Sequence, residues 1–179
     1  MNLKEYQQKA KRTLLDLGEK LNLAHMVLGI CSEDEEVLKA LVNKDTIGIG
    51  EEIADKFWYI ANYCTFRNID LQELYNNRID FEQEDWEKKT SISTVKLSKL
   101  QDCVKKYIAY GKPIDKKVEE NCLKGLIFGL ADDIDYNNLD LFTILNNNIN
   151  KLKVRFPDKF TEEKALNRNL TAERTELEK

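Results

Sequence analysis

The chain has 179 residues, a mass of 20.9 kDa and 42% hydrophobic residues, which predicts one domain built around a single core. Its 28 basic and 32 acidic residues leave a net charge of −4, which argues against a protein that binds a nucleic acid polymer. The longest apolar stretch, residues 21–30, is about half of the ~20 residues that cross a bilayer, and no apolar leader is visible. We therefore expect a soluble cytoplasmic protein with no membrane partner.

Helical periodicity dominates the chain, whereas alternating strand-like runs are scarce. A first helix is predicted over residues 3–17 and is ended by Gly18. Further helices are predicted at about 20–43, 50–68, 70–77, 94–110, 115–134 and 139–155, with a last helix from Thr171. The polar segment 80–91 is the best candidate for a long connection. The expected fold is all-α, most simply a helical bundle.

The cysteines and the single histidine show no pattern of a zinc or nucleophile site. The cysteines lie far apart among apolar residues, which favours buried free thiols over disulfides or metal ligands: Cys31, Cys64, Cys103 and Cys122. His25 would have to serve any zinc site or His-activated nucleophile, and nothing near it has the required spacing. These chemistries are therefore not expected.

Two acidic residues lie beside the apolar arc of the helix predicted over 20–43. This arc contains Met26, Ile30, Val37 and Leu41. Glu33 projects at its edge and Glu36 lies one turn further on the same side, whereas Asp34 and Glu35 point away. An acid beside a core-facing stripe costs desolvation energy unless something pairs with it.

The next helix repeats this arrangement. Its apolar face contains Ile53, Phe57, Ile60 and Cys64, and a polar stripe beside that face contains Glu52, Asp55, Tyr59 and Asn62. The short connection at 44–50 favours antiparallel packing of the two helices, which would bring both acidic pairs together near the loop. We therefore expect the carboxylates of Glu33, Glu36, Glu52 and Asp55 to converge.

Four converging carboxylates repel one another unless a cation neutralises them. Ligation by oxygen atoms alone suits Mg²⁺, with Mn²⁺ as a second possibility, and not zinc. The alternative is that these are surface acids that complement a helix N-terminus and nearby lysines. The repetition of the pair at short distance favours the metal site.

The ExxE and ExxD motifs resemble those of the MazG-like all-α nucleotide pyrophosphohydrolases, a family related to the dimeric dUTPases. The similar segments are LGICSEDEEVLKAL, with Glu33 and Glu36, and GEEIADKFWYIANYC, with Glu52, Asp55 and the additional acid Glu51. The phrases NINKLKVRFPDKFT and ALNRNLTAERTELE resemble the tail of many phage and bacterial members. The resemblance covers roughly residues 20–75 and 100–179.

This resemblance implies a hydrolase of nucleotide metabolism that converts a nucleoside or deoxynucleoside triphosphate to the monophosphate and pyrophosphate. The carboxylates would hold Mg²⁺, and Glu36 or Glu52 would accept a proton from the attacking water. The expected substrate contacts are Asn62, Lys151 and Arg155, while Trp58 and Tyr59 either stack on the base or belong to the core. The alternative function is a non-catalytic helical module that binds nucleotides or a protein partner.

The chain is interpreted as one domain, residues 1–179, with a metal-binding helix pair at 20–77 and a C-terminal tail at 156–179. Residues 94–155 are either a degenerate copy of that pair or two ordinary core helices with a chance similarity. In the alignment of the two halves, Leu100, Cys103 and Leu123 replace Glu33, Glu36 and Asp55, and only Glu119 and Glu120 keep the acidic character. A homodimer is expected, since the family forms oligomers and these apolar replacements would extend the apolar surface.

Overall fold

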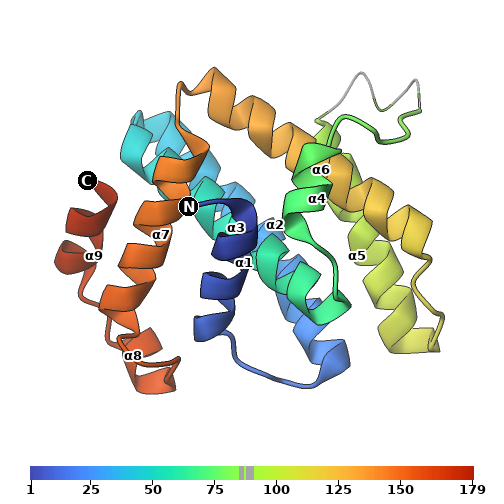
Figure 1. Cartoon of the computed structure of the whole chain (residues 1–179), viewed down its shortest axis with the longest axis horizontal. Helices are drawn as coiled ribbons and strands as arrows, with labels where there is room; N and C mark the ends of the chain where they lie inside the picture. The colour runs from blue at the N-terminus through green and yellow to red at the C-terminus, as the bar shows by residue number, and fades with distance from the viewer. Residues whose placement is uncertain (85–86, 88–90) are drawn as a thin grey trace.

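The computed structural model describes residues 1–84, 87 and 91–179, and the regular secondary structure of this part is entirely helical (Figure 1). The helices are α1 (Leu3–Ala10), α2 (Glu19–Asn43), α3 (Thr46–Arg67), α4 (Leu71–Asn76), α5 (Ile92–Tyr110), α6 (Lys116–Tyr136), α7 (Leu141–Arg155), α8 (Glu162–Leu166) and α9 (Leu170–Leu177). The all-α prediction is therefore confirmed. No helix in these described ranges is long and apolar enough to cross a membrane.

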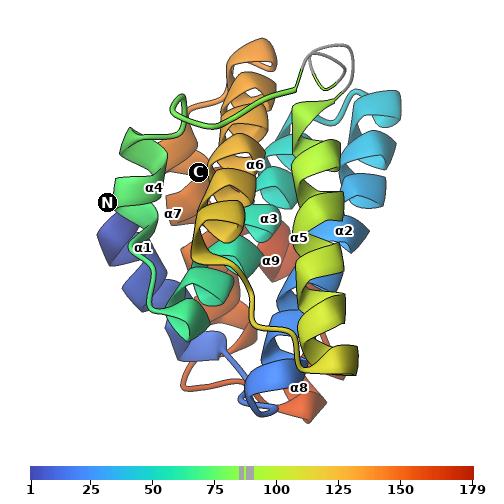
Figure 2. The same cartoon turned by 90° about the vertical axis from the view of Figure 1, so that its right-hand side faces the viewer.

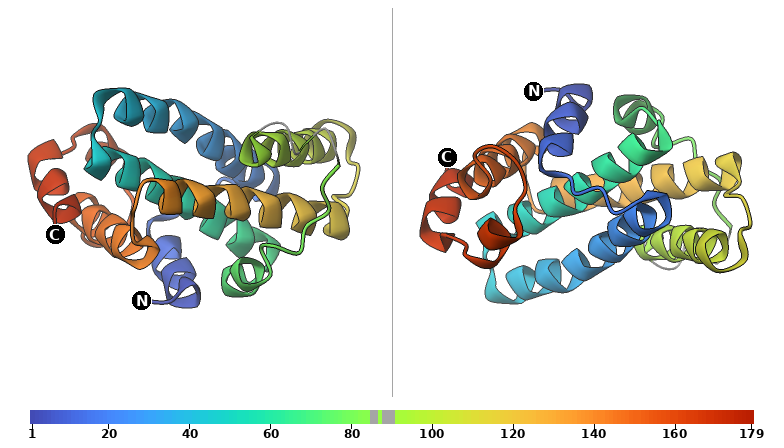
Figure 3. Two further views of the ribbon diagram at one scale, coloured as in Figure 1. Left: turned by 90° about the horizontal axis from the view of Figure 1, so that it is seen from above. Right: turned by 90° about the horizontal axis from the view of Figure 1, so that it is seen from below.

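The reversal between α2 and α3 determines the position of the acidic residues. Lys44 ends α2 in the left-handed conformation, with φ of 55°, and its amide bonds back to the last turn of the helix. Asp45 then caps α3 by accepting a hydrogen bond from the amide of Gly48 at 3.0 Å. Two residues therefore separate the helices, which run antiparallel and side by side (Figure 3).

The expectation that the first helix extends to residue 17 is wrong. After α1, a single 3₁₀ turn covers Lys11–Thr13, and the chain then becomes extended. Side-chain hydrogen bonds stabilise this extended segment, because Asn22 accepts from the amide of Leu17 and Asp16 accepts from Asn22, both at 2.8 Å. Gly18, with φ of 86°, begins α2 and does not end α1.

The other helix predictions are correct to within a few residues, with two exceptions. Helix α3 begins at Thr46, four residues before its predicted start, because Asp45 supplies the cap. Helix α8 was not expected, and Thr161 caps it through a hydrogen bond from the amide of Lys164. Within the predicted connection at 80–91, residues 85–86 and 88–90 lie outside the described residues.

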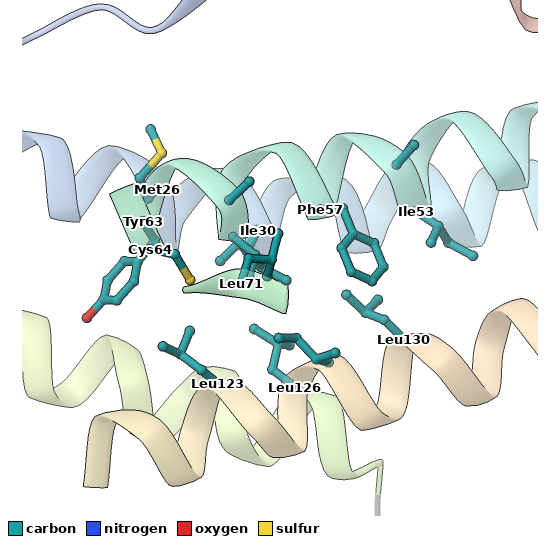
Figure 4. Close-up of a cluster of buried hydrophobic side chains, with 14 of the residues drawn as sticks. Met26, Ile30, Ile53, Phe57, Tyr63, Cys64, Leu71, Leu123, Leu126 and Leu130 are labelled. Atoms are coloured by element: carbon teal, nitrogen blue, oxygen red, sulfur yellow. The ribbon is translucent and has the colours of Figure 1, made fainter. Parts of the chain in front are cut away.

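The core draws buried residues from α1 to α7, and Figure 4 shows the part of it between α3 and α6. The predicted apolar face of α3 is fully buried, as expected, and it packs towards three leucines of α6: Leu123, Leu126 and Leu130. On α2 the apolar arc is shorter than predicted, because Leu41 in the last turn is 38% exposed. Helices α5 and α6 lie side by side and both contribute to this core, whereas α7 to α9 gather at the opposite end (Figures 1 and 2).

The second helix pair, α5 and α6, places hydrophobic contacts where the first pair carries acids. Leu100 and Leu123 are fully buried inside this chain, so they do not extend its apolar surface as expected. Glu119 is also buried, and it accepts hydrogen bonds from Arg67 at 2.7 and 3.0 Å and from the Tyr63 hydroxyl at 2.6 Å. The burial of the two leucines removes one reason to expect a homodimer. The homodimer itself stays a prediction.

All four cysteines are free thiols, as expected, but they differ in exposure. Cys64 and Cys122 are buried and Cys103 is half-buried. The prediction is wrong for Cys31, which is exposed because it follows the buried Ile30 by about 100° around α2 and falls on the outer side.

Candidate functional site

Three of the four predicted carboxylates converge. Each of Glu33 on α2 and Glu52 and Asp55 on α3 has an oxygen atom within 4.8 Å of an oxygen of both others. All three side chains are partly buried between the antiparallel helices. The i,i+3 spacing of Glu52 and Asp55 places both on the side of α3 that faces Glu33, as the helical wheel predicts.

Burial and mutual repulsion make these carboxylates resist ionisation. Burial, followed by the charge of Asp55, raises the pKa of Glu33 to about 7. Burial together with Asp55 and Glu51 raises the pKa of Glu52 to about 8. The cluster therefore lacks enough positive charge to ionise fully at neutral pH, which is the electrostatic condition that favours a bound cation.

Asp55 is held in place from α7. The ammonium of Lys151 donates to Asp55 at 2.6 Å and to Glu51 at 3.1 Å, and the amide of Asn148 donates to Asp55 at 2.5 Å. Lys151 is fully buried. Burial alone would lower the pKa of Lys151, but the charges of Asp55 and Glu51 outweigh it and raise the pKa above its usual value. Lys151 therefore contacts the acidic cluster. It does not line the pocket, although it was expected to contact the substrate there.

Glu36 lies apart from the three converging carboxylates. It lines the same pocket, but its carboxylate pairs with Lys39 at 2.9 Å and its side chain is 47% exposed. Exposed pairs of this kind contribute about 0–1 kcal/mol, so Glu36 remains available to a ligand. The structure thus brings Glu33, Glu52 and Asp55 together and leaves Glu36 beside them.

The acidic cluster forms one wall of a pocket of about 460 Å³. The remaining walls come from four parts of the chain: the segment after α1, the N-terminal half of α2, α3 and the C-terminal region. They are Thr13, Leu15, His25, Trp58, Tyr59, Leu152, Arg155, Phe156, Phe160, Ala165 and Arg168. The pocket therefore combines carboxylates, two arginines and aromatic rings.

The two arginines of the pocket share one buried carboxylate. Glu173 on α9 is 2% exposed and accepts hydrogen bonds from Arg155 at 2.5 and 3.0 Å and from Arg168 at 2.8 and 3.3 Å. Burial would raise the pKa of Glu173, but the hydrogen bonds from both arginines lower it below its usual value. Glu173 therefore fixes two cationic groups beside the acidic cluster.

Trp58 and Tyr59 line the pocket, as one of their two predicted roles requires. The indole N–H of Trp58 donates a hydrogen bond to the Thr13 hydroxyl at 3.1 Å. The Tyr59 ring lies edge-on to the Trp58 ring, with centroids 5.0 Å apart. Gly29 on α2 allows the Tyr59 ring to approach, because a Cβ at this position would overlap the ring. Asn62, the other expected substrate contact on α3, is fully buried and is not part of the pocket wall.

Several contributors to the site were not predicted. Arg168 and Phe160 belong to the C-terminal phrases quoted above, but no side-chain periodicity singles them out. Asn148 lies in an asparagine-rich stretch, where only the three-residue spacing from Lys151 hints at a shared face. Asp34 does not contribute to the site. It points away from the cluster, as expected, and forms an ion pair with the buried Lys56 of α3.

A larger hollow of about 630 Å³ lies elsewhere, against α5 and the segment that leads into α6. Its wall contains Val95, Cys103, Pro113 and Ile114 beside lysine and aspartate side chains, but none of the converging carboxylates. We place the candidate site in the smaller pocket because the convergent ionisable groups and their perturbed pKa values occur there.

The donor set of the acidic cluster fits a divalent cation. It offers oxygen ligands from Glu33, Glu52 and Asp55 within one small volume, and hard cations such as Mg²⁺ and Mn²⁺ prefer oxygen. Comparison with known proteins adds no family assignment, since no protein-family model, curated protein or solved structure matches this chain.

Proposed function

We propose that this chain hydrolyses nucleoside or deoxynucleoside triphosphates to the monophosphate and pyrophosphate with Mg²⁺, as its resemblance to the MazG-like pyrophosphohydrolases implies. The observation that supports this most is the convergence of three carboxylates in the wall of a pocket that also carries arginines and aromatic rings. A nucleotide needs these three kinds of contact, for its metal ion, its phosphates and its base. Mn²⁺ is an alternative cation for the same donor set.

In this proposal, Glu33, Glu52 and Asp55 hold the cation. When bound, Mg²⁺ neutralises charge on the triphosphate and lowers the pKa of a bound water. Glu36 accepts the proton of the attacking water, because it lines the pocket without being one of the three converging carboxylates. Its exposed pair with Lys39 exchanges readily with water.

The arginines and Lys151 have different roles in this proposal. Arg155 and Arg168 line the pocket and bind phosphate oxygens, and Glu173 orients their planar guanidinium groups. Lys151 is buried, so it positions Asp55 and Glu51 and does not touch the substrate. Trp58 and Tyr59 provide aromatic surface for a base.

The test is pyrophosphate release from a panel of ribonucleoside and deoxyribonucleoside triphosphates, with and without Mg²⁺. We expect Mg²⁺-dependent release that falls about a hundredfold or more in Glu36→Gln, since general base catalysis contributes about 10²–10⁴-fold. Glu35→Gln is the matched control, because this neighbouring side chain is 73% exposed and lies outside the pocket.

Failure of every triphosphate to release pyrophosphate would contradict the proposed reaction. Nucleotide binding without hydrolysis would instead favour a non-catalytic nucleotide-binding module. Equal activity of Glu36→Gln and Glu35→Gln would remove Glu36 from the mechanism.

A further inference from the structure

Within the described part of the chain, two buried side-chain polar atoms have no hydrogen-bond partner: Nδ1 of His25 and Oδ1 of Asn62. A buried polar atom without a partner costs about 1–3 kcal/mol, and such atoms are uncommon in native proteins. His25 also lines the pocket that contains the acidic cluster. Nδ1 itself is shielded, but the ring is only half-buried and its other nitrogen, Nε2, is not one of these buried atoms, so Nε2 is the nitrogen that a ligand in the pocket would reach.

His25 and Asn62 lie at the same level of the antiparallel helix pair. His25 precedes Glu33 by eight residues on α2, and Asn62 follows Asp55 by seven residues on α3. At 1.5 Å per residue, these separations correspond to about 12 and about 10 Å along the helices. Both side chains are therefore about two turns from the carboxylates, a distance comparable with the span of a nucleotide from its phosphates to the edge of its base.

Aromatic rings surround this end of the pocket. The His25 ring lies edge-on to Tyr59, with centroids 5.8 Å apart and an interplanar angle of 76°. Trp58 adjoins Tyr59, and both line the pocket together with Leu15 and His25. Arg155, from the C-terminal region of the chain, lines the same pocket and lies close enough for its charge to act on the Tyr59 hydroxyl. The surroundings of His25 therefore offer aromatic contact and a ring nitrogen for a base, with an arginine nearby for the phosphates of the same nucleotide.

The charge state of His25 agrees with this environment. Burial lowers its pKa below the usual value, so the ring is neutral at pH 7. A neutral imidazole has one nitrogen that donates and one that accepts a hydrogen bond. It can therefore pair with the donors and acceptors on the edge of a nucleobase, whereas it carries no charge to attract a phosphate.

We propose that His25 determines base specificity by hydrogen-bonding the edge of the nucleobase, so that the pocket takes a nucleotide and not an inorganic polyphosphate. This inference rests on the proposed function for the identity of the ligand. Asn62 is assigned no contact with the base, because it is not part of the pocket wall. Its buried amide donates to the carbonyl of Trp58 at 3.0 Å, which supports the helix behind the aromatic wall.

NMR of the imidazole nitrogens tests this directly, because His25 is the only histidine of the chain. Tag-free protein with ¹⁵N-labelled histidine is titrated with the 5′-monophosphates of adenosine, guanosine, cytidine and uridine. We expect the Nε2 resonance to shift with one base more than with the others, and to stay unchanged with inorganic tripolyphosphate and Mg²⁺. Equal shifts with all four bases, or an unchanged resonance while tryptophan fluorescence reports binding, would overturn the proposal.

Two variants separate recognition from packing. His25→Phe keeps a ring against Tyr59 but removes both nitrogens, and His25→Gln keeps hydrogen-bonding atoms. We expect the affinity ratio between the best and worst monophosphate to fall about tenfold to hundredfold in His25→Phe and to be partly retained in His25→Gln. An unchanged ratio in His25→Phe, or an equal loss for all bases in both variants, would contradict base recognition.

The outcomes also distinguish this inference from the proposed function. Base-selective shifts at His25 without any pyrophosphate release by the wild type would support recognition by His25 and reject the hydrolase. Pyrophosphate release with the same base preference in wild type and His25→Phe would reject the role of His25 alone. Absence of both binding and release would reject both.

Discussion

Replacement of Lys151 by methionine tests the role of this buried ammonium in the acidic cluster. The side chain of Lys151 is fully buried, and its ammonium lies 2.6 Å from Asp55 and 3.1 Å from Glu51. Removing one partner of a buried ion pair costs about 3–5 kcal/mol, because the other charge stays buried without compensation. Asp55 and Glu51 keep 24% and 17% of their side-chain surface exposed, so we expect the lower end, about 3 kcal/mol.

For a chain of this length, that loss lowers the Tm by about 6–12 °C. The assay is urea and thermal unfolding of Lys151→Met without metal and at saturating Mn²⁺. We expect Mn²⁺ to stabilise the variant more than the wild type, because the cation replaces the missing positive charge beside Asp55. Lys153→Met is the matched control, since Lys153 lies on the same helix and is exposed.

Two results would refute this reasoning. If Lys151→Met and Lys153→Met unfold alike, the buried ion pair does not contribute to stability. If Lys151→Met keeps its metal-free stability but loses affinity for triphosphates, Lys151 is a phosphate contact, as the sequence suggested.

Three further predictions concern the acidic cluster and the pocket beside it. Glu52→Gln should abolish Mn²⁺ binding and turnover while leaving metal-free stability unchanged or slightly higher, since it removes a carboxylate whose ionisation burial and the neighbouring acids oppose. Isothermal titration and thermal unfolding check this, and a much lower Tm would show a structural ion-pair role. The raised pKa values of Glu33, about 7, and Glu52, about 8, mean that the native state binds more protons than the unfolded state between about pH 4.5 and 8. Their contribution to metal-free stability should therefore be present at low pH and be lost as the pH rises through 7 and 8. Urea unfolding at several pH values measures this in the wild type and in the double variant with both glutamates changed to glutamine. If the stability of the wild type follows that of the double variant across this pH range, the raised pKa values are contradicted. Gly29→Ala should displace the Tyr59 ring and destabilise the protein despite the ~1 kcal/mol gain in helix propensity, whereas near-UV circular dichroism and stability equal to wild type would show that the ring does not need this glycine.

The sequence predicts the helix pair and most of its acidic cluster because both depend on local periodicity. Glu33, Glu52 and Asp55 can be placed on facing sides of two helices from their spacing and the short connection alone. Glu36 has the same spacing, but its position relative to the others depends on the exact rotation of α2 and on the competing Lys39. Such details involve a few ångströms and cannot be read from a helical wheel.

Contacts between distant segments could not be predicted in the same way. Lys151 was expected beside the phosphates, but its burial against Asp55 depends on how α7 packs on α3. The end of α1 was missed because hydrogen bonds between Asp16, Leu17 and Asn22 compete with helix formation. Leu100 was expected to enlarge the surface, whereas the tertiary fold buries it.

Hydrolysis in ¹⁸O-enriched water tests the central claim most directly, because it reports which phosphorus atom is attacked. We predict that, with Mg²⁺ and the preferred triphosphate, mass spectrometry finds ¹⁸O in the nucleoside monophosphate and none in pyrophosphate. Release of inorganic phosphate and a nucleoside diphosphate, or ¹⁸O in pyrophosphate, would contradict a pyrophosphohydrolase that directs water to the α-phosphorus.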